Sequence, residues 1–426
     1  MSHPNCTFSP ADILIPYDCG LTKWAVVACD QYTSQPEYWE RVDKFVGDAP
    51  SSLRLILPES KLEDDNVDEE IEAINKTMEQ YLEEDHLRCV ENSFFYLERK
   101  LANGKTRYGL LGKLDLEQYS YEKGSGTPVR ATEGTVLSRI PPRMKVRKNA
   151  AIELPHIMVL IDDPKKEIIE PLRTKEAKKQ MPMIYIATLM EHSGRVTTYS
   201  LSDKQAEKVQ AQLNALSDPK LFEEKYNAPG KPVLTYAMGD GNHSLATAKA
   251  CWEELKPTLS EEERENHPAR YALVELVNLH DESLEFEAIH RVVFDVDPQG
   301  LLDALLAAYP GAFLGEGEGH LFQYVIGETS GTITVPHPTA QLAVGTLQNF
   351  LDQYLEEHGG KVDYIHGEDV VRELSGKPNS IGFLLPSMAK SELFPTVIFD
   401  GALPRKTFSM GEACDKRFYM EARKIR

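Results

Sequence analysis

Residues 235–255, TYAMGDGNHSLATAKACWEEL, constrain the fold more than any other stretch of this chain. The apolar run from Val233 to Met238 predicts a strand, and the pattern from His243 to Leu255 predicts a helix. Gly239 and Gly241 lie between them and favour a tight turn. A strand that passes directly into a helix in this way is a unit of α/β architecture.

The predicted helix start has the properties of an anion-binding site. The first N–H groups of a helix have no partner within it, and glycine lets a ligand approach the backbone closely. Asp240 could cap the helix or hold a metal ion, while His243 could donate to a phosphate or carry a proton. The structural alternative is that Asp240 only caps the helix and Gly241 only permits the turn.

A second candidate lies in KGSGTPVRATEGTVLSRIPPRMKVRKNA, residues 123–150, a Gly- and Pro-rich segment that is basic within an acidic protein. Glu133 has many cationic neighbours in sequence: Arg130, Arg139, Arg143, Lys145, Arg147 and Lys148. A carboxylate beside guanidinium groups stays ionised, so Glu133 could act as a metal ligand or as a base beside a phosphate. The alternative is a solvated surface loop.

Two further segments carry polar groups suited to a ligand. His290 and Arg291 begin an apolar strand, where they point to opposite faces. A histidine at a strand end is more often structural. In ALPRKTFSMGEA, Lys406, Thr407 and Ser409 offer one cation and two hydroxyls, although the spacing is not that of a Walker A loop.

The other elements predict an α/β to α+β fold with mixed β-sheets, hairpins and flanking helices. Asn-Gly at 103–104 predicts a two-residue hairpin, and further hairpins are expected around 192–194 and within 321–335. Helices are expected from Pro36, from Val67, over 203–216 and over 342–357. Hairpins interleaved with helices favour mixed sheets over purely parallel ones.

The length of 426 residues predicts two or three domains. We expect an N-terminal α/β region over 1–125, with an acidic helix and a hairpin. A central region over 126–300 carries the Glu133 and Asp240–His243 motifs, and a C-terminal α+β region covers 301–426.

Charge and composition exclude several classes of protein. The formal net charge of −20 repels nucleic acid and anionic lipid, so neither nucleic acid nor a membrane is an expected partner. The six cysteines are scattered without zinc-site spacing and are expected to be reduced. Because no apolar run approaches the roughly 20 residues of a membrane span and the first residues lack a signal-peptide pattern, we expect a cytoplasmic protein.

Taken together, these segments resemble the bacterial family called domain of unknown function 1015, or DUF1015. The resemblance covers nearly the whole chain, in the order Pro16-Tyr17-Asp18, Arg130 with Glu133 and Thr135, Asp240 to Ser244, Ile289-His290-Arg291, and Pro404 with Lys406-Thr407. The family's central motif is Asp-Gly-His-His-Arg. Here Asn242 replaces its first histidine and Ser244 its arginine, so the guanidinium that would contact a phosphate is missing.

The central motif is in turn similar to the phosphate-binding box of the ParB and sulfiredoxin-like fold, whose members include nucleotide-dependent free-serine kinases, sulfiredoxins and CTP-binding partition proteins. This second resemblance rests on a single short motif. Sulfiredoxin chemistry needs a cysteine in the box, which is absent here.

The resemblance implies a protein that binds a nucleotide (ATP, ADP or CTP) or another small phosphorylated molecule with Mg²⁺, and that transfers or hydrolyses a phosphoryl group. Glu133, Asp240, His243 and His290 are the catalytic candidates, with Asp240 and Glu133 as the Mg²⁺ ligands. The ligand-binding candidates are Arg130, Thr135, Gly241, Asn242, Ser244, Arg291, Lys406 and Thr407. This hypothesis requires distant segments to meet in one cleft.

Two other functions stay open. One is a metal-dependent hydrolase with Asp240, His243 and His290 as ligands, which tightly bound zinc or manganese would indicate. The other is a non-enzymatic module that senses a nucleotide, which binding without turnover would indicate. Neither catalysis nor self-association into a homo-oligomer is decided by the sequence.

Overall fold

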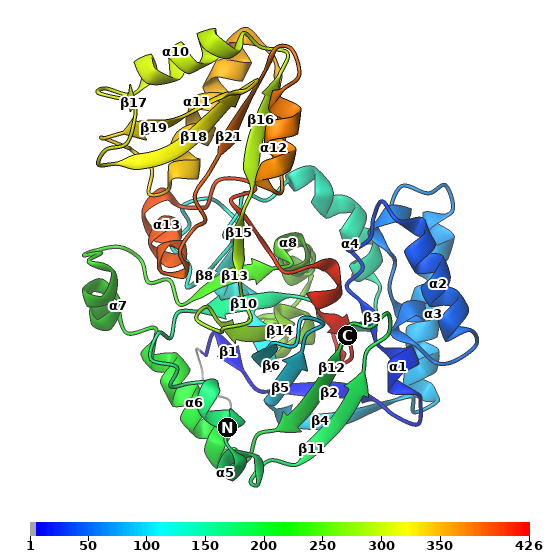
Figure 1. Ribbon diagram of the computed structural model, residues 1–426. Helices are drawn as coiled ribbons and strands as arrows, with labels where there is room; N and C mark the ends of the chain where they lie inside the picture. Colours follow the sequence, from blue (N-terminus) through cyan, green and yellow to red (C-terminus); the bar gives the residue numbers. More distant parts are fainter. Residues whose placement is uncertain (1–5) are drawn as a thin grey trace. The chain divides into compact units, whose positions relative to one another are not determined.

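A computed structural model describes residues 6–426 and divides the chain into two compact units (Figure 1). Unit 1 consists of the residues up to Leu284 together with Gly411–Arg426, and unit 2 consists of Glu285–Met410. Unit 1 is therefore built from two separate stretches of chain. The three regions expected from the sequence describe order along the chain, and they stay a prediction.

The centre of unit 1 is a ten-stranded mixed sheet in the order β11-β12-β5-β6-β14-β10-β13-β8-β7, with β1 paired to β6. Neighbouring strands are antiparallel except for β10–β14, β13–β8 and β7–β8, which are parallel. The strands are β1 Phe8–Ser9, β5 Phe95–Lys100, β6 Thr106–Asp115, β7 Tyr119–Ser120, β8 Val129–Arg130, β10 Met158–Ile161, β11 Met183–Thr188, β12 Arg195–Ser200, β13 Tyr236–Asp240 and β14 Tyr271–Asn278.

Alternation along the central strands gives the sheet two apolar faces. Leu110 and Val274 belong to one core cluster, and their neighbours Leu111 and Leu273 belong to the other. Helix α8 (Asn242–Leu255) covers the first face through Leu245 and Trp252. Helix α3 (Val67–Glu83) covers the second with Ile71, Ile74, Met78 and Tyr81, at the helical spacing that the sequence predicts.

Helices α1 to α3, drawn in blue, lie on one side of the sheet in Figure 1. The helices of unit 1 are α1 Leu21–Trp24, α2 Pro36–Val46, α3 Val67–Glu83, α4 Ile140–Lys148, α5 Lys175–Lys178, α6 Asp203–Ala215, α7 Pro219–Tyr226, α8 Asn242–Leu255 and α9 Glu261–Asn266. Short 3₁₀ turns include η1 Ser52–Leu55, η2 Glu59–Lys61, η4 Leu137–Arg139, η5 Glu170–Arg173 and η9 Ala413–Asp415. Among residues 6–426, no helix has both the length and the apolar character required to cross a membrane.

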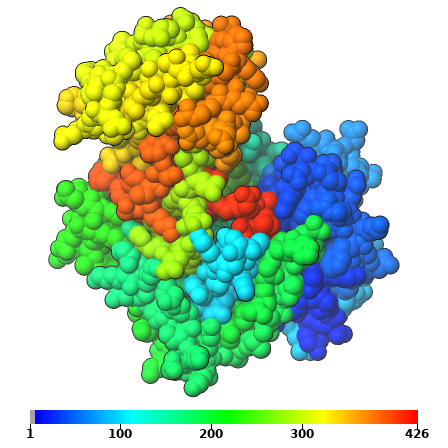
Figure 2. Space-filling view, viewed as in Figure 1, coloured from blue at the N-terminus to red at the C-terminus, as the bar shows by residue number. Residues whose placement is uncertain are grey.

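The segment 411–426 is part of the interior of unit 1. Its strands β23 (Phe418–Tyr419) and β24 (Arg423–Lys424) pair with β3 (Val26–Val27) and β9 (Ile152–Glu153). Arg417 is 6% exposed and forms ion pairs with Glu275 and Glu421. In Figure 2 the red surface of this segment lies beside the blue surface of the N-terminal part. A further antiparallel pair of unit 1 joins β2 (Ala11–Pro16) to β4 (Leu87–Ser93).

Unit 2 has a six-stranded antiparallel sheet in the order β17-β19-β18-β21-β16-β20 and a separate pair β15–β22. The strands are β15 Phe286–Ala288, β16 His290–Phe294, β17 Phe313–Leu314, β18 His320–Ile326, β19 Thr329–Val335, β20 Lys361–Ile365, β21 Ser380–Leu384 and β22 Phe408–Met410. The helices are α10 Pro298–Ala308, α11 Ala343–His358, α12 Glu368–Ser375 and α13 Leu393–Asp400.

The structure confirms the mixed α/β class and the three predicted hairpins, which are β5–β6, β11–β12 and β18–β19. The first differs from the predicted two-residue turn, because Leu101 and Lys105 pair and the loop runs from Ala102 to Gly104. At the first turn Gly104 has a φ of 86°, a left-handed value that glycine adopts without strain. The central strand differs in position, because β13 begins at Tyr236 and continues to Asp240. Part of the basic segment 123–150 is helical, as α4, where its composition favours a loop.

Candidate functional site

The turn between β13 and α8 depends on one glycine. Gly241 has a φ of 77° and is the N-cap residue of α8. A β-carbon at this position would lie 3.2 Å from the Cα of Ile157, so the turn also has no room for a larger residue. The prediction that Asp240 caps α8 is wrong. Its carboxylate instead accepts a hydrogen bond from the Gly241 N–H at 2.9 Å and forms an ion pair with Lys416.

The N-terminus of α8 is open. No side chain caps it, and the first hydrogen bond of the helix runs from the Leu245 N–H to the Gly241 carbonyl. The amides of Asn242, His243 and Ser244 therefore precede the first bonded amide and belong to the positive end of the helix dipole. Backbone geometry alone makes this end of α8 attractive to an anion.

Cationic side chains add to this potential. The Lys416 ammonium lies 3.0 Å from the Asp240 carboxylate, and both side chains are largely buried. Burial lowers the pKa of His243 below its ordinary value, and the nearby Arg143 and Arg139 lower it further. His243 is consequently a neutral imidazole near pH 7, and two guanidinium groups lie close enough to act on it.

The segment 132–136 is fixed against this turn at two points. The Thr132 hydroxyl donates to the Met238 carbonyl at 2.8 Å, and the Val136 N–H donates to His243 Nε2 at 3.3 Å. Glu133 and Thr135 lie between these two bonds, so the structure brings both predicted motifs of unit 1 together. Within the described residues, the buried Thr135 Oγ1 and Asn242 Oδ1 have no hydrogen-bond partner.

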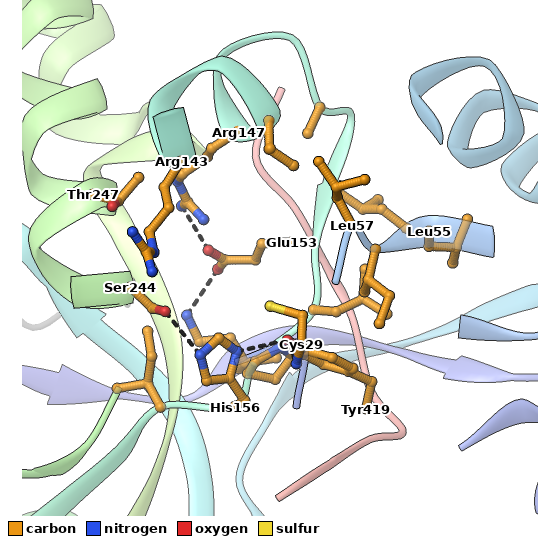
Figure 3. A pocket seen from close by; sticks show the side chains of 18 of the residues that line it. Cys29, Leu55, Leu57, Arg143, Arg147, Glu153, His156, Ser244, Thr247 and Tyr419 are labelled. Atoms are coloured by element: carbon orange, nitrogen blue, oxygen red, sulfur yellow. Dashed lines mark hydrogen bonds and ion pairs between the residues drawn. The ribbon is translucent and has the colours of Figure 1, made fainter. Parts of the chain in front are cut away.

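Ser244 begins a chain of hydrogen bonds that runs inward from α8. Its hydroxyl lies 2.8 Å from His156 Nε2, and His156 Nδ1 lies 2.8 Å from the Tyr419 phenol oxygen. The Cys29 N–H donates to that same oxygen at 3.1 Å. Figure 3 shows Ser244, His156, Tyr419 and Cys29 in this order.

These groups line a cavity of about 150 Å³ in unit 1. One part of its wall is apolar, and its residues include Leu55, Ile56, Leu57, Leu62, Met78 and Val146. Two carboxylates on the wall are paired with arginines. Glu59 accepts from Arg143 Nε at 2.9 Å, and Glu153 contacts Arg147 at 2.6 Å and Arg423 at 2.7 Å. The cavity therefore combines an apolar wall with the polar groups around Ser244 (Figure 3).

Arg130 holds the backbone around β8, and its role as a ligand-binding residue stays a prediction. It is 5% exposed, and its guanidinium donates to the backbone carbonyls of Thr127, Pro232 and Val233. These bonds hold the end of β8 to the chain segment that leads into β13. The hydrogen bonds of this guanidinium therefore go to backbone carbonyl groups.

Two of the predicted ligand-binding residues of unit 2 form hydrogen bonds to its backbone. Arg291 is fully buried and donates to the carbonyls of Ile289, Arg405 and Lys406 and to the Gln348 side chain. The Thr407 hydroxyl donates to the Pro404 carbonyl at 2.6 Å. These polar groups hold the backbone of unit 2, and the ligand-binding roles of Arg291 and Thr407 stay a prediction.

His290 and Lys406 are more exposed to solvent than Arg291 and Thr407. His290 Nδ1 accepts from the Leu385 N–H at 3.1 Å, and burial lowers the pKa of this imidazole. Lys406 is exposed and has a φ of 53°. These two residues belong to unit 2, whereas the residues described above around α8 all belong to unit 1.

A metal centre lacks a ligand set in the described part of the chain. Residues 6–426 contain no group of three or more His, Cys, Asp or Glu side chains placed to hold a metal ion. Asp240 is engaged by Lys416, which competes with any cation for the carboxylate.

The sequence patterns do not predict three residues of the site, namely His156, Lys416 and Tyr419. Each comes from a segment without a motif, and each reaches the site through pairing that is distant in sequence. For His156 the sequence gives one indication. This histidine lies alone among apolar residues, in LPHIM, directly before a strand. By composition alone that signal fits a structural histidine equally well.

The fold and the site define a mixed α/β protein with an uncapped helix start, next to ion-paired cationic side chains and a partly apolar cavity. The chain belongs to the family described as protein of unknown function, DUF1015, whose pattern matches residues 15–354. No curated protein matches the chain.

Several solved structures match at low similarity. A free serine kinase in complex with AMP is 12% identical, with 74% of this chain and 90% of that chain covered and a TM-score of 0.36. A conserved hypothetical protein from Pyrococcus furiosus is 12% identical, with 74% and 94% covered and a TM-score of 0.34. SbnI from Staphylococcus aureus, truncated at its C-terminus, is 9% identical, with 72% and 85% covered and a TM-score of 0.37. No residue role is transferred from these structures.

Proposed function

We propose that this protein binds the phosphate group of a nucleotide or another small phosphorylated molecule at the start of α8, and that Mg²⁺-dependent phosphoryl transfer or hydrolysis is its reaction. The observation that carries the proposal is the uncapped first turn of α8 at Gly241, with Lys416, Arg139 and Arg143 around it. Amides at a helix start and nearby cations are the groups that bind phosphate oxygens in proteins.

His243 is suited to donate a hydrogen bond to a bound phosphate. Its Nε2 accepts from the Val136 N–H, so the proton of the neutral ring is on Nδ1, where it can be donated to a ligand. The lowered pKa keeps the ring neutral near pH 7. Glu133 is the carboxylate that we propose as base or Mg²⁺ ligand, and Asp240 would be the second carboxylate to hold Mg²⁺.

The strand-turn-helix of β13 and α8 is the element that we propose as a ParB and sulfiredoxin-like phosphate box. In support, Gly241 has the left-handed φ that brings amides to the surface, and α8 begins without a cap. The departures at Asn242 and Ser244 leave the backbone amides in place. Cations from outside the motif, above all Lys416, take the part of the missing arginine.

The test is a thermal-shift titration of the full chain with phosphate, pyrophosphate, ATP, ADP and CTP, each with and without Mg²⁺. A ligand that binds only the folded state raises its stability, by roughly 2.7 kcal/mol at a hundredfold excess over Kd. Lys416→Met should weaken phosphate or nucleotide binding about tenfold, equivalent to about 1.4 kcal/mol.

The matched control is Lys424→Met, which removes an exposed lysine from the same segment and should leave Kd unchanged. The proposal fails if no phosphorylated compound stabilises the protein, or if both lysine variants bind alike. Binding of a nucleotide without turnover of it, measured by phosphate release, would instead make the protein a nucleotide sensor.

A further inference from the structure

Ser244 and His156 have the geometry of a nucleophile and its base. The Ser244 hydroxyl oxygen is 2.8 Å from His156 Nε2, and the other ring nitrogen is 2.8 Å from the Tyr419 oxygen. A hydroxyl, an imidazole and a third group that orients the imidazole form the arrangement by which proteins activate serine. His156 is 9% exposed, so its ring is held in place by surrounding atoms.

Tyr419 orients the imidazole of His156. Burial and nearby negative groups raise the pKa of the phenol well above its ordinary value, so Tyr419 keeps its proton. The phenol oxygen also accepts from the Cys29 N–H at 3.1 Å, which holds the phenol in place. The nucleophilic arrangement needs the His156 tautomer whose Nδ1–H donates to the phenol oxygen, because Nε2 is then left to accept the serine proton.

Ser244 lies in the first turn of α8, where its hydroxyl is next to the helix start. Because its own N–H is one of the open amides, a phosphoryl group attacked by Ser244 Oγ would have the first-turn amides beside its oxygens. The serine is thus placed where charge develops during attack.

The cavity beside Ser244 limits the organic part of the substrate. Its wall includes Ser244, His156 and Thr247 together with the apolar side chains of η1, α3 and α4. A volume of about 150 Å³ admits a compact group such as a phenyl ring or a short branched chain. The apolar part of the wall favours an apolar organic group beside the phosphate.

We propose that Ser244 is a nucleophile with His156 as its base, and that it accepts the phosphoryl group of a phosphate monoester whose organic part is compact and apolar. The inference rests on the proposed phosphate site. The Ser244 Oγ–P bond forms as the P–O bond to the alcohol breaks, while the hydroxyl proton passes to His156 Nε2 and then to the departing oxygen. Water subsequently cleaves the phosphoserine, which releases inorganic phosphate and restores Ser244.

The test uses diisopropyl fluorophosphate, which reacts with activated serines to form an O–P bond with loss of fluoride. Mass spectrometry of digested wild-type protein should locate one adduct on the peptide that contains Ser244. Ser244→Ala should abolish it, and His156→Gln should slow labelling at least a hundredfold. Ser138→Ala, which removes an exposed serine on a nearby segment, should label like the wild type.

Two further measurements keep the proposal falsifiable if His156→Gln folds poorly. Labelling of the wild-type chain should disappear in concentrated urea, because unfolding separates Ser244 from His156. Phenyl phosphate should protect Ser244 at concentrations at least tenfold lower than inorganic phosphate. Adducts at other serines only, labelling that survives unfolding, or equal protection by the two phosphates would overturn the proposal.

The failure of the phosphate site itself has a different signature. Thermal shifts with phosphate or nucleotide depend on Lys416 and the α8 amides, and they should persist in Ser244→Ala. Loss of those shifts in the wild type would refute the phosphate site, whereas intact shifts without labelling would refute the nucleophile alone.

Discussion

Two strand ends carry a histidine motif in this protein, and they use their polar groups differently. In unit 1, β13 ends at Asp240 and passes into α8, whose first turn has no cap. In unit 2, β16 begins with His290 and Arg291, and their polar atoms bind backbone groups of the same unit. A polar motif indicates a ligand site only where the fold leaves its hydrogen-bonding groups without a partner.

The strongest test of this contrast removes the buried arginine of unit 2. Arg291→Met should lower the free energy of unfolding by about 3 kcal/mol or more, because several buried acceptors would lose their donor. All three tryptophans lie in unit 1, so far-UV circular dichroism in a urea titration is the measurement that also monitors unit 2.

The control is Arg405→Met, which breaks an exposed ion pair with Asp352 and should cost less than about 1 kcal/mol. Phosphate affinity should be unchanged in both variants. A stable Arg291→Met protein with weakened phosphate binding would mean that Arg291 serves a ligand.

A smaller effect is expected from the turn of unit 1. Gly241→Ala should destabilise the protein by about 1 to 3 kcal/mol, since it combines a left-handed φ with a β-carbon 3.2 Å from the Ile157 backbone. Tryptophan fluorescence suits the measurement because Trp252 is buried in α8.

Gly230→Ala separates the two contributions, because Gly230 has a φ of 71° and no atom within 4 Å of the added carbon. Gly230→Ala should lower the free energy of unfolding by less than Gly241→Ala does. The difference between the two variants is the steric contribution at Gly241. Equal losses in the two variants would show that the turn can shift to admit a side chain, and that its fit to Ile157 is loose.

The smallest effect is expected from protonation of His243. Because burial and two arginines lower its pKa below 6.5, the unfolded chain binds a proton that the folded chain does not. This contribution to stability is complete above pH 6.5 and is lost as pH falls below it. His243→Gln should therefore lose less stability than the wild type between pH 7.5 and pH 5, as measured by urea denaturation.

The corresponding variant in unit 2 sharpens the comparison. Burial also lowers the pKa of His290, so His290→Gln should change the pH dependence with the same sign. Added phosphate should reduce the His243 effect only, because an anion at α8 favours the protonated imidazole. A phosphate effect on both histidines would argue against a specific site at α8.

Local signals explain what the sequence can predict here. The Asn-Gly pair at 103–104 and the Gly-Asp-Gly sequence before α8 each encode a turn within a few residues, so the hairpin and the strand-turn-helix are predictable. Helix α4 is harder to predict, because Pro141 and Pro142 suggest a loop although proline is well suited to the first turn of a helix.

Most of the site could not be predicted, because it depends on pairing between distant segments. His156 and Tyr419 meet only because β23 pairs with β3 at the edge of the cavity. Composition likewise cannot tell whether an arginine faces solvent or carbonyl groups. Arg130 and Arg291 look like phosphate ligands in the sequence, and both are bound to backbone carbonyls in the structure.

The two-part construction of unit 1 has a consequence for its assembly on the ribosome. Translation delivers the first 284 residues well before Gly411–Arg426, and at about 5 to 20 residues per second the intervening segment takes roughly ten seconds to synthesise. During that interval the nascent chain lacks Lys416, Tyr419 and the strands that close the edge of the cavity. Ligand recognition at α8 therefore begins only after the polypeptide has been elongated past unit 2.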